Sequence, residues 1–220
     1  MKYLKLYENF MEGESLPGLD NKKEDIYQNS PIILIGSQGS GKSTTSKRLS
    51  EKLNIPLIET DMCMIDKEYE TACKGEPGVE IEIKRVGDGI SYSSNKEYEF
   101  CVMKKIFEKY SNQKIVLDVG GSHAHWDQKF LDQIMKMFNS TPNIFLFTVS
   151  DDENETYTFL KGRRSGRGES ISPENEIKFQ KVISDLNQTY KDTQKVYIIK
   201  EDKTEKTTEE IVDEIVERLQ

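Results

Sequence analysis

The sequence predicts an α/β fold in which a mainly parallel sheet is covered by helices on both faces. Short apolar segments rich in β-branched residues alternate with longer segments whose apolar residues recur at helical spacing. The 220 residues, 35% of them hydrophobic, are enough for one domain with a substantial core. Because such sheets bind ligands at the carboxyl ends of their strands, we expect a binding site at that edge.

The expected strands are short and apolar, and turn-forming residues flank them. They lie at residues 32–35, 56–58, 115–119, 143–149 and 195–200. Helices are predicted where apolar side chains recur every three or four positions. These helices lie at about 41–53, 100–110, 126–138, 152–161 and 173–190, followed by a closing helix that carries Ile211, Ile215 and Leu219.

Two helix starts carry clear capping signals. Ser172 and Pro173 fit an N-cap followed by a first helical residue. Thr207 and Glu210 have the spacing of a capping box ahead of the closing helix. These signals support the two C-terminal helices independently of their apolar spacing.

Three segments depart from the regular alternation of strands and helices. Residues 1–30 mix charged, polar and turn-forming residues, and we interpret them as an N-terminal extension before a domain at 31–220. In residues 66–95, glycine and proline surround the alternating stretch VEIEIKRV, which predicts a hairpin-like insertion. Residues 160–172 are predicted to form a flexible, arginine-containing loop that serves as a lid.

The composition restricts which binding partners and which cellular compartment are expected. A net charge of −8 and a pI near 5.1 argue against broad electrostatic binding to nucleic acid or to an anionic membrane. No apolar run approaches the roughly 20 residues of a membrane span, and the first ten residues lack the apolar stretch of a signal peptide. The three cysteines lack paired short spacings, so we expect structural thiols in a reducing, cytoplasmic setting.

The glycine-rich segment has the pattern of a phosphate-binding loop. Residues 36–43 read GSQGSGKS and fit G-x-x-x-x-G-K-[ST] in full, between a predicted strand and a predicted helix. In this motif backbone N–H groups and the helix N-terminus attract phosphate, the lysine bridges the outer phosphates, and the serine hydroxyl binds Mg²⁺. We therefore expect ATP and Mg²⁺ to bind here. The expected nucleotide-binding residues are Gly36, Gly39, Ser40, Gly41, Lys42, Ser43 and Thr44.

Acidic residues follow two of the expected strands. Glu59 and Asp61 end the second strand and are expected on one face of it, where a carboxylate can position Mg²⁺ or accept a hydroxyl proton. A helix N-cap at Asp61 is the alternative. The strand at 115–119 places Asp118 at the same edge as a further candidate for the Mg²⁺ site, and Gly120 and Gly121 would let a ligand approach the backbone. A simple turn at the strand end explains these glycines as well.

Basic residues and histidines give two further candidates. The stretch LKGRRSGRGES at 160–170 holds one lysine and three arginines, whose charges can neutralise phosphate once the loop closes; a merely solvated basic loop is the alternative. His123 and His125 lack a suitably spaced third metal ligand. We interpret these histidines as helix-start or surface residues.

These motifs together resemble shikimate kinase and its relatives among the small P-loop kinases. The likeness rests on GSQGSGKST at 36–44, LSEKLNIPLIETD at 49–61, VGGS at 119–122 and the arginine-bearing lid. It covers residues 30–220 and is strongest over 32–61. The resemblance implies a P-loop NTPase three-layer sandwich with a five-stranded parallel sheet in the order 2-3-1-4-5, and ATP-dependent phosphorylation of a small hydroxyl-bearing acceptor.

The resemblance also implies roles for individual residues. Glu59 and Asp61 match the acidic pair of the family, with Asp61 as the acceptor-binding base. Gly120 and Gly121 match the last two glycines of its triple-glycine motif. Arg163 matches an arginine beside the adenine, and Arg167 matches the catalytic lid arginine that reaches the phosphates.

The sequence departs from the family where shikimate's carboxylate would be held. NKEYEF at 95–100 has no arginine, and LNQTY at 186–190 places Leu186 where an arginine is expected. Arg85 in the insertion is a candidate substitute. Without two such donors a carboxylate loses its bidentate anchor, which argues against shikimate itself as the acceptor.

Three functions remain open from the sequence. We favour a kinase that transfers the γ-phosphate of ATP to a hydroxyl acceptor. A nucleoside or nucleotide kinase is the first alternative, because RSGRGES followed by a long helix also resembles the lids of those enzymes. A non-catalytic ATP-binding module is the second. The strand ending DVGG carries no adjacent glutamate to polarise water, which argues against a motor-type ATPase.

Overall fold

The computed structural model describes residues 29–86, 89–169 and 172–219. The extension expected at residues 1–30 lies outside this description, apart from its last two residues. None of the helices in the described ranges combines the length and apolar character that a membrane span requires.

Five strands of the described chain form one parallel sheet. They are β1 (Ile32–Gly36), β2 (Leu57–Glu59), β5 (Val116–Asp118), β6 (Ile144–Thr148) and β7 (Gln194–Tyr197). Their spatial order is β2-β5-β1-β6-β7, and each neighbouring pair is parallel. Numbered within this sheet alone, the order is the expected 2-3-1-4-5. The predicted fold class is therefore confirmed.

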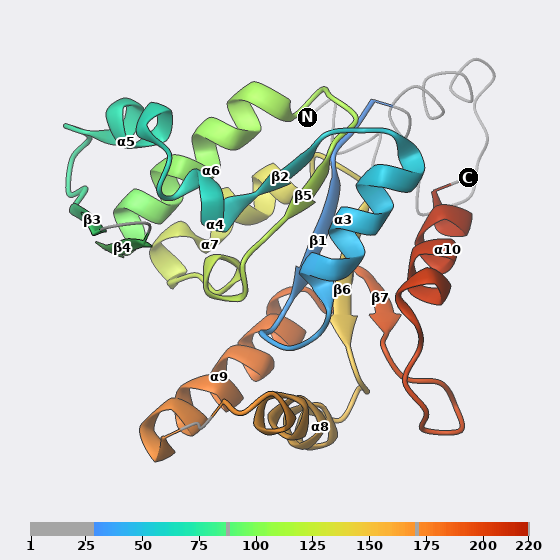
Figure 1. Cartoon of the computed structure of the whole chain (residues 1–220). Coiled ribbons are helices and arrows are strands. Elements are labelled where there is room, and N and C mark those ends of the chain that lie inside the picture. Colours follow the sequence, from blue (N-terminus) through green and yellow to red (C-terminus); the bar gives the residue numbers. More distant parts are fainter. Residues whose placement is uncertain (1–28, 87–88, 170–171, 220) are drawn as a thin grey trace.

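Helices cover both faces of this sheet, as Figure 1 shows. One face carries α3 (Lys42–Leu53) and α10 (Thr208–Arg218), and the other carries α6 (Lys96–Tyr110) and α7 (Gln128–Phe138). The alternation of side chains along β1 explains the two layers: Ile33 packs with α6 and α7, and Leu34 packs with α3 and α10. Both residues are fully buried.

The capping signals at the two C-terminal helices are confirmed. The Ser172 hydroxyl accepts a hydrogen bond from the Asn175 N–H at the start of α9 (Pro173–Thr189). Both hydrogen bonds of the capping box between Thr207 and Glu210 form at the start of α10. These bonds satisfy N–H groups that the first turn of a helix leaves without partners.

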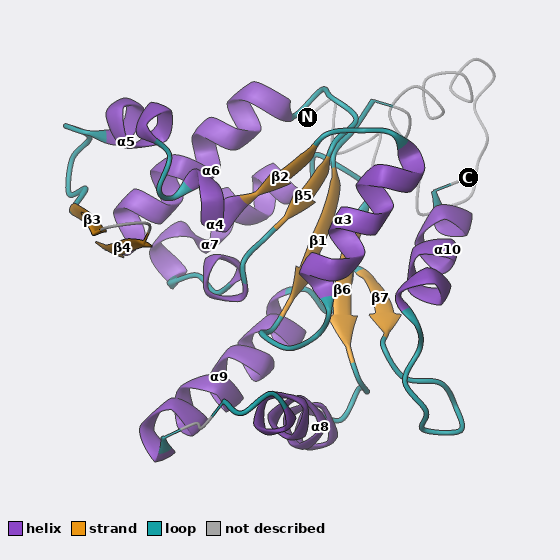
Figure 2. Ribbon diagram, viewed as in Figure 1, coloured by secondary structure: helices purple, strands orange, loops and turns teal. Residues whose placement is uncertain are grey.

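The insertion at 66–95 begins with a helix and ends with a pair of strands. A one-turn helix, α4 (Thr60–Cys63), precedes α5 (Lys67–Cys73), and β3 (Ile81–Val86) then pairs antiparallel with β4 (Gly89–Ser94). Figure 2 shows this small sheet well apart from the main one. Arg85 belongs to β3, but its side chain lies outside the described residues.

The cysteines correct one expectation. Cys73 at the end of α5 and Cys101 in α6 form a disulfide, so the prediction of structural thiols is wrong for these two. Their 28-residue separation carries no pairing signal, because they meet only once α5 folds back onto α6. Cys63 remains a free, buried thiol, and burial raises its pKa to about 11.

The arginine-bearing loop is shorter than predicted. The helix expected at 152–161 extends as α8 (Glu153–Gly166), so Arg163 and Arg164 lie in its last turn. Cationic side chains are favourable at a helix C-terminus, and a helix tolerates a glycine at a cost of about 1 kcal/mol relative to alanine. Only 167–169 and 172 remain as described loop between α8 and α9.

Candidate active site

The loop between β1 and α3 presents backbone N–H groups at the carboxyl edge of the sheet. Gly39 and Gly41 adopt positive φ angles of 92° and 85°, a conformation that glycine adopts readily. Gly41 is the N-cap of α3, and no side chain caps the first turn. An anion can therefore take the hydrogen bonds that a capping side chain would otherwise take.

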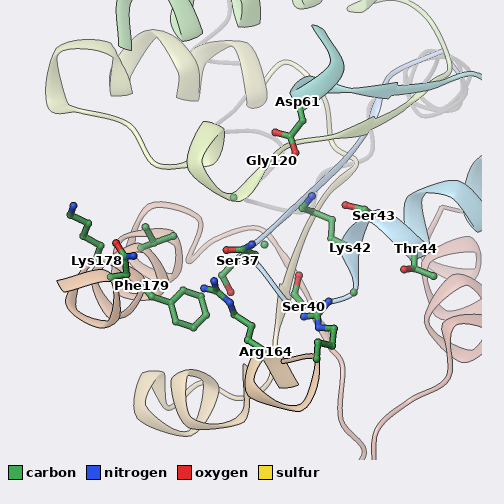
Figure 3. A pocket seen from close by; sticks show the side chains of 18 residues that line it. Ser37, Ser40, Lys42, Ser43, Thr44, Asp61, Gly120, Arg164, Lys178 and Phe179 are labelled. Atoms are coloured by element: carbon green, nitrogen blue, oxygen red, sulfur yellow. The ribbon is translucent and has the colours of Figure 1, made fainter. Parts of the chain in front are cut away.

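A cavity of about 660 Å³ opens beside this loop (Figure 3). Residues 36–44 form one wall, Asp61, Gly120 and Gly121 form a second, and α8, the following turn and α9 contribute Arg164, Arg167, Asn175, Lys178, Phe179 and Val182. All seven expected nucleotide-binding residues of the loop are thus part of the lining. So are the expected acceptor-side residues Asp61, Gly120 and Gly121.

Lys42 and Asp118 form a buried ion pair below the cavity. The Lys42 Nζ atom binds Asp118 Oδ1, and the two side chains are 7% and 4% exposed. Ser46 Oγ donates a second hydrogen bond to Asp118 Oδ2 at 3.1 Å. Asp118 lies beneath the lining and not within it, so its direct contact in this structure is with the lysine of the phosphate loop.

The acidic pair expected on one strand face is divided between two elements. Glu59 ends β2 and pairs at 3.9 Å with Lys47 of α3, outside the cavity lining. The chain then turns into α4, so the alternation of a strand no longer applies and Asp61 reaches the cavity from the helix. The prediction that both carboxylates share a strand face is wrong for this reason.

Asp61 is held against a buried histidine. The His123 Nδ1 atom lies 3.2 Å from Asp61 Oδ1 and 3.1 Å from Thr60 Oγ1, and the side chain of His123 is 1% exposed. The hydrogen bond from His123 lowers the pKa of the Asp61 carboxyl below its usual value. The interpretation of His123 as a helix-start or surface residue is wrong, because His123 is buried and is the third residue of a 3₁₀ helix, η1 (Gly121–Ala124).

Gly120 and Gly121 make room for two different neighbours. A Cβ atom on Gly120 would overlap Asp61 Oδ1 and would lie 2.8 Å from His123 Nδ1. A Cβ atom on Gly121 would lie 3.3 Å from Gln38 N and from Gly36 O. The first glycine therefore accommodates the carboxylate, and the second lets the turn after β5 pack against the phosphate loop.

The two arginines expected to act from the lid lie in different surroundings. Arg163 donates a hydrogen bond to the Gly39 carbonyl at 3.0 Å and pairs with Glu205 at 3.5 Å, so it supports the loop from outside the cavity. Arg167 lines the cavity near Gly39 and lies 3.8 Å from Glu169.

Two further parts of the site are Arg164, one of the three predicted lid arginines but without a role of its own in the resemblance, and one face of α9, which the sequence did not assign to the site. Arg164 binds Glu169 at 2.8 Å, and its guanidinium lies 5.1 Å from the centre of the Phe179 ring. Asn175, Lys178, Phe179 and Val182 line the cavity at positions three, four and seven residues apart, which is one face of a helix. This helical spacing could have indicated the face from the sequence alone. However, its apolar members, Phe179 and Val182, are equally typical of a helix face that packs against the core.

The donor set fits Mg²⁺ bound together with a nucleotide. No three His, Cys, Asp or Glu residues of the described chain come together as a ready-made metal site. Mg²⁺ usually keeps several waters and takes one or two protein oxygens plus phosphate oxygens. Ser43 and Asp61 offer such oxygens within the cavity, next to the backbone N–H groups that suit phosphate.

The family of this chain follows from a match to a protein-family model. Residues 35–178, more than half of the chain, match the family model described as "AAA domain". The chain belongs to the AAA domain family. The matched span of this AAA domain runs from the phosphate loop to α9 and so includes nearly all of the cavity lining.

Curated relatives of this AAA domain are small kinases. It is 26% identical over 147 residues to an adenylate kinase of Pseudarthrobacter chlorophenolicus, covering 67% of this chain and 73% of that protein. It is 27% identical over 165 residues to a shikimate kinase of Staphylococcus haemolyticus, covering 72% of this chain and 87% of that protein. A shikimate kinase of Leptospira biflexa is 32% identical over 90 residues, which cover 41% of this chain and 42% of that protein.

Solved structures give the same fold. The shikimate kinase of Acinetobacter baumannii in complex with shikimate aligns with a TM-score of 0.54 at 14% identity, covering 89% of this chain and 96% of that one. That of Bacteroides thetaiotaomicron aligns with a TM-score of 0.52 at 20% identity, covering 86% and 98%. The predicted resemblance to shikimate kinase-like small P-loop kinases is confirmed.

Proposed function

We propose that this protein is a phosphotransferase that moves the γ-phosphate of ATP to a hydroxyl group of a small acceptor. One observation carries the proposal: the Asp61 carboxylate and the phosphate loop with Lys42 face one another across the same cavity (Figure 3). Nucleotide sensing alone needs a phosphate loop but no carboxylate opposite it. A transfer reaction needs both, because the acceptor must lose a proton as it attacks phosphorus.

The reaction assigns a step to each wall of the cavity. Asp61 accepts the proton of the acceptor hydroxyl, the hydroxyl oxygen bonds to the γ-phosphorus, and the bond to the ADP oxygen breaks. Lys42 and the backbone N–H groups of the loop stabilise the charge on the phosphates. Arg164 and Arg167 contribute further positive charge from the opposite side. Mg²⁺, held through Ser43, would supply additional charge neutralisation when bound.

Nucleotide binding is proposed for the loop residues, with Arg163 holding the loop in place. Arg163 acts here through the Gly39 carbonyl that it binds. Asp118 keeps Lys42 paired beneath the phosphates. The Glu59 carboxylate pairs with Lys47 outside the lining, which argues against a role of Glu59 in Mg²⁺ binding. Arg85 stays a prediction.

A nucleoside or nucleoside monophosphate is the second candidate acceptor. The observation that favours it is the adenylate kinase relative, which matches 67% of the chain. The cavity wall formed by Lys178, Asn175 and Phe179 offers positive charge, an amide and an aromatic face to such a molecule.

A screen of acceptors tests the proposal and separates the two candidates. Purified protein with ATP and Mg²⁺ is assayed for ADP release against shikimate, hexoses, cyclic polyols, nucleosides and nucleoside monophosphates. Acceptor-stimulated ADP release that Asp61→Asn abolishes supports a kinase, and the stimulating compound gives its class. If no acceptor in the panel raises ADP release although ATP binds, the proposal fails and a non-catalytic ATP-binding module is favoured.

Gly120→Ala is expected to lower turnover about 10-fold or more. The new Cβ atom would overlap Asp61 Oδ1 and come within 2.8 Å of the buried His123 Nδ1 atom, so the carboxylate and the imidazole must move, whereas the φ of −53° suits alanine. Turnover, ATP affinity and thermal unfolding are measured together. Gly162→Ala is the control, since its Cβ atom meets no other group within 4 Å. Wild-type turnover in Gly120→Ala would contradict the need for a fixed carboxylate.

A further inference from the structure

A buried pair of polar side chains stands directly behind Asp61. The side chain of Asp61 is 71% exposed toward the cavity, whereas that of His123 behind it is 1% exposed and Thr60 is fully buried. His123 does not line the cavity. It is therefore placed to act on Asp61 without touching ATP or the acceptor.

Three separate elements converge at this point. Thr60 and Asp61 come from α4, Gly120 from the turn after β5, and His123 from η1. The Gly120 N–H donates to Thr60 Oγ1 at 2.8 Å, which ties α4 to the turn after β5. The His123 Nδ1 atom then lies 3.1 Å from the same hydroxyl and 3.2 Å from Asp61 Oδ1.

The chemistry of the groups fixes the direction of the bond to Asp61. An ionised carboxylate can only accept hydrogen bonds, so the Nδ1 atom of His123 must carry the proton that the two share. A charge-assisted bond of this kind is stronger than one between neutral groups. The lowered pKa of Asp61 has this bond as its largest cause.

Glycine at position 120 is also required for the contact between Asp61 and His123. A Cβ atom there would collide with Asp61 Oδ1 and come within 2.8 Å of His123 Nδ1. The carboxylate and the imidazole can meet only because this position is glycine. The contact therefore depends on residues 60, 61, 120 and 123 together, although they come from two distant parts of the chain.

We propose that His123 is a positioning residue, which holds the Asp61 carboxyl in the orientation that faces the phosphate loop. The inference rests on the proposed function, since it concerns the carboxylate of the transfer step. An exposed aspartate otherwise samples several rotamers, and a displacement of about 1 Å at a reacting group can cost about 100-fold in rate. By excluding the unproductive rotamers, His123 raises the turnover number and leaves ATP binding unchanged.

Two substitutions at position 123 separate the hydrogen bond from the packing. In His123→Asn the amide N–H₂ occupies nearly the place of the Nδ1 atom and keeps a donor for Asp61. In His123→Leu the volume is largely kept and the donor is lost. The matched control is His125→Gln, because His125 lies two residues further on, pairs with Asp185 at 2.9 Å and is outside the lining.

Kinetics with ATP, Mg²⁺ and the stimulating acceptor of the panel give the first readout. We expect His123→Leu to lower kcat about 10-fold to 100-fold with little change in the KM for ATP, and His123→Asn to restore most of the loss. Adding His123→Leu to Asp61→Asn should cause little further loss, because His123 acts through that carboxylate. Wild-type kcat in His123→Leu, or equal losses in the Asn and Leu variants, would overturn the inference.

Crystal structures of the wild type and both variants with ADP give a second readout that needs no acceptor. Asp61 should face the phosphate loop in the wild type and in His123→Asn, and should turn away in His123→Leu. An unchanged Asp61 in His123→Leu overturns the inference even if the panel finds no acceptor. A wild type without acceptor-stimulated ADP release, by contrast, overturns the proposed function. Should His123→Leu fail to fold, a loss of kcat in well-folded His123→Asn would overturn the donor role.

Discussion

Asp61→Asn is expected to lower acceptor-dependent turnover by about 100-fold or more while ATP still binds. Asparagine keeps the shape of aspartate but cannot take up the hydroxyl proton. The side chain is mostly exposed at the cavity wall, so its replacement should leave the core unaffected. ADP release measures the first effect, and calorimetric titration with an ATP analogue measures the second.

The control for this substitution is Asp132→Asn on α7. Asp132 is exposed and outside the cavity lining, so the variant makes the same change of charge at a site without a proposed role. Turnover of Asp61→Asn equal to that of Asp132→Asn would remove Asp61 from the transfer step.

Lys42→Ala is expected to weaken both ATP binding and transfer, with turnover lower by about 100-fold or more. The substitution removes the ammonium group that meets the outer phosphates. It also leaves Asp118 buried without its cation, and breaking a buried pair in this way typically costs about 3–5 kcal/mol of stability. Urea unfolding and titration with ADP measure the two effects separately.

A double variant separates the two roles of Lys42. Lys42→Ala combined with Asp118→Ala removes both buried charges, so part of the lost stability should return while ADP affinity stays low. Lys47→Ala is the control on the same helix, because Lys47 is exposed and outside the lining. Restored ADP affinity in the double variant would contradict a direct role of Lys42 at the phosphates.

The phosphate loop could be predicted because local signals specify it, and the sheet order because the chain resembles a known family. The glycine pattern at 36–43 between an apolar strand and a helix leaves few backbone alternatives, and the resemblance supplied the order of strands. The place of Asp61 followed from the same resemblance. The prediction that Asp61 shares a strand face with Glu59 was wrong, because the end of β2 depends on where the chain turns into α4.

The rest of the site depends on contacts between distant residues. The bond of His123 with Asp61 joins positions 62 residues apart, and the spacing of the two histidines gives no hint of it. The helical end of α8 is a case of competing signals: two glycines indicated a loop, yet the buried Leu160 and the cations of the last turn favour continued helix. Arg164 is carried into the cavity as a result.

The disulfide between Cys73 and Cys101 separates the hairpin of β3 and β4 from the helices α4 and α5 that follow the main sheet. The chain that leaves the sheet through α4 and α5 is fastened to α6 before β3 begins. A change of length in the outer hairpin therefore meets this crosslink before it can displace α4, and the reacting groups can keep their alignment while the hairpin varies.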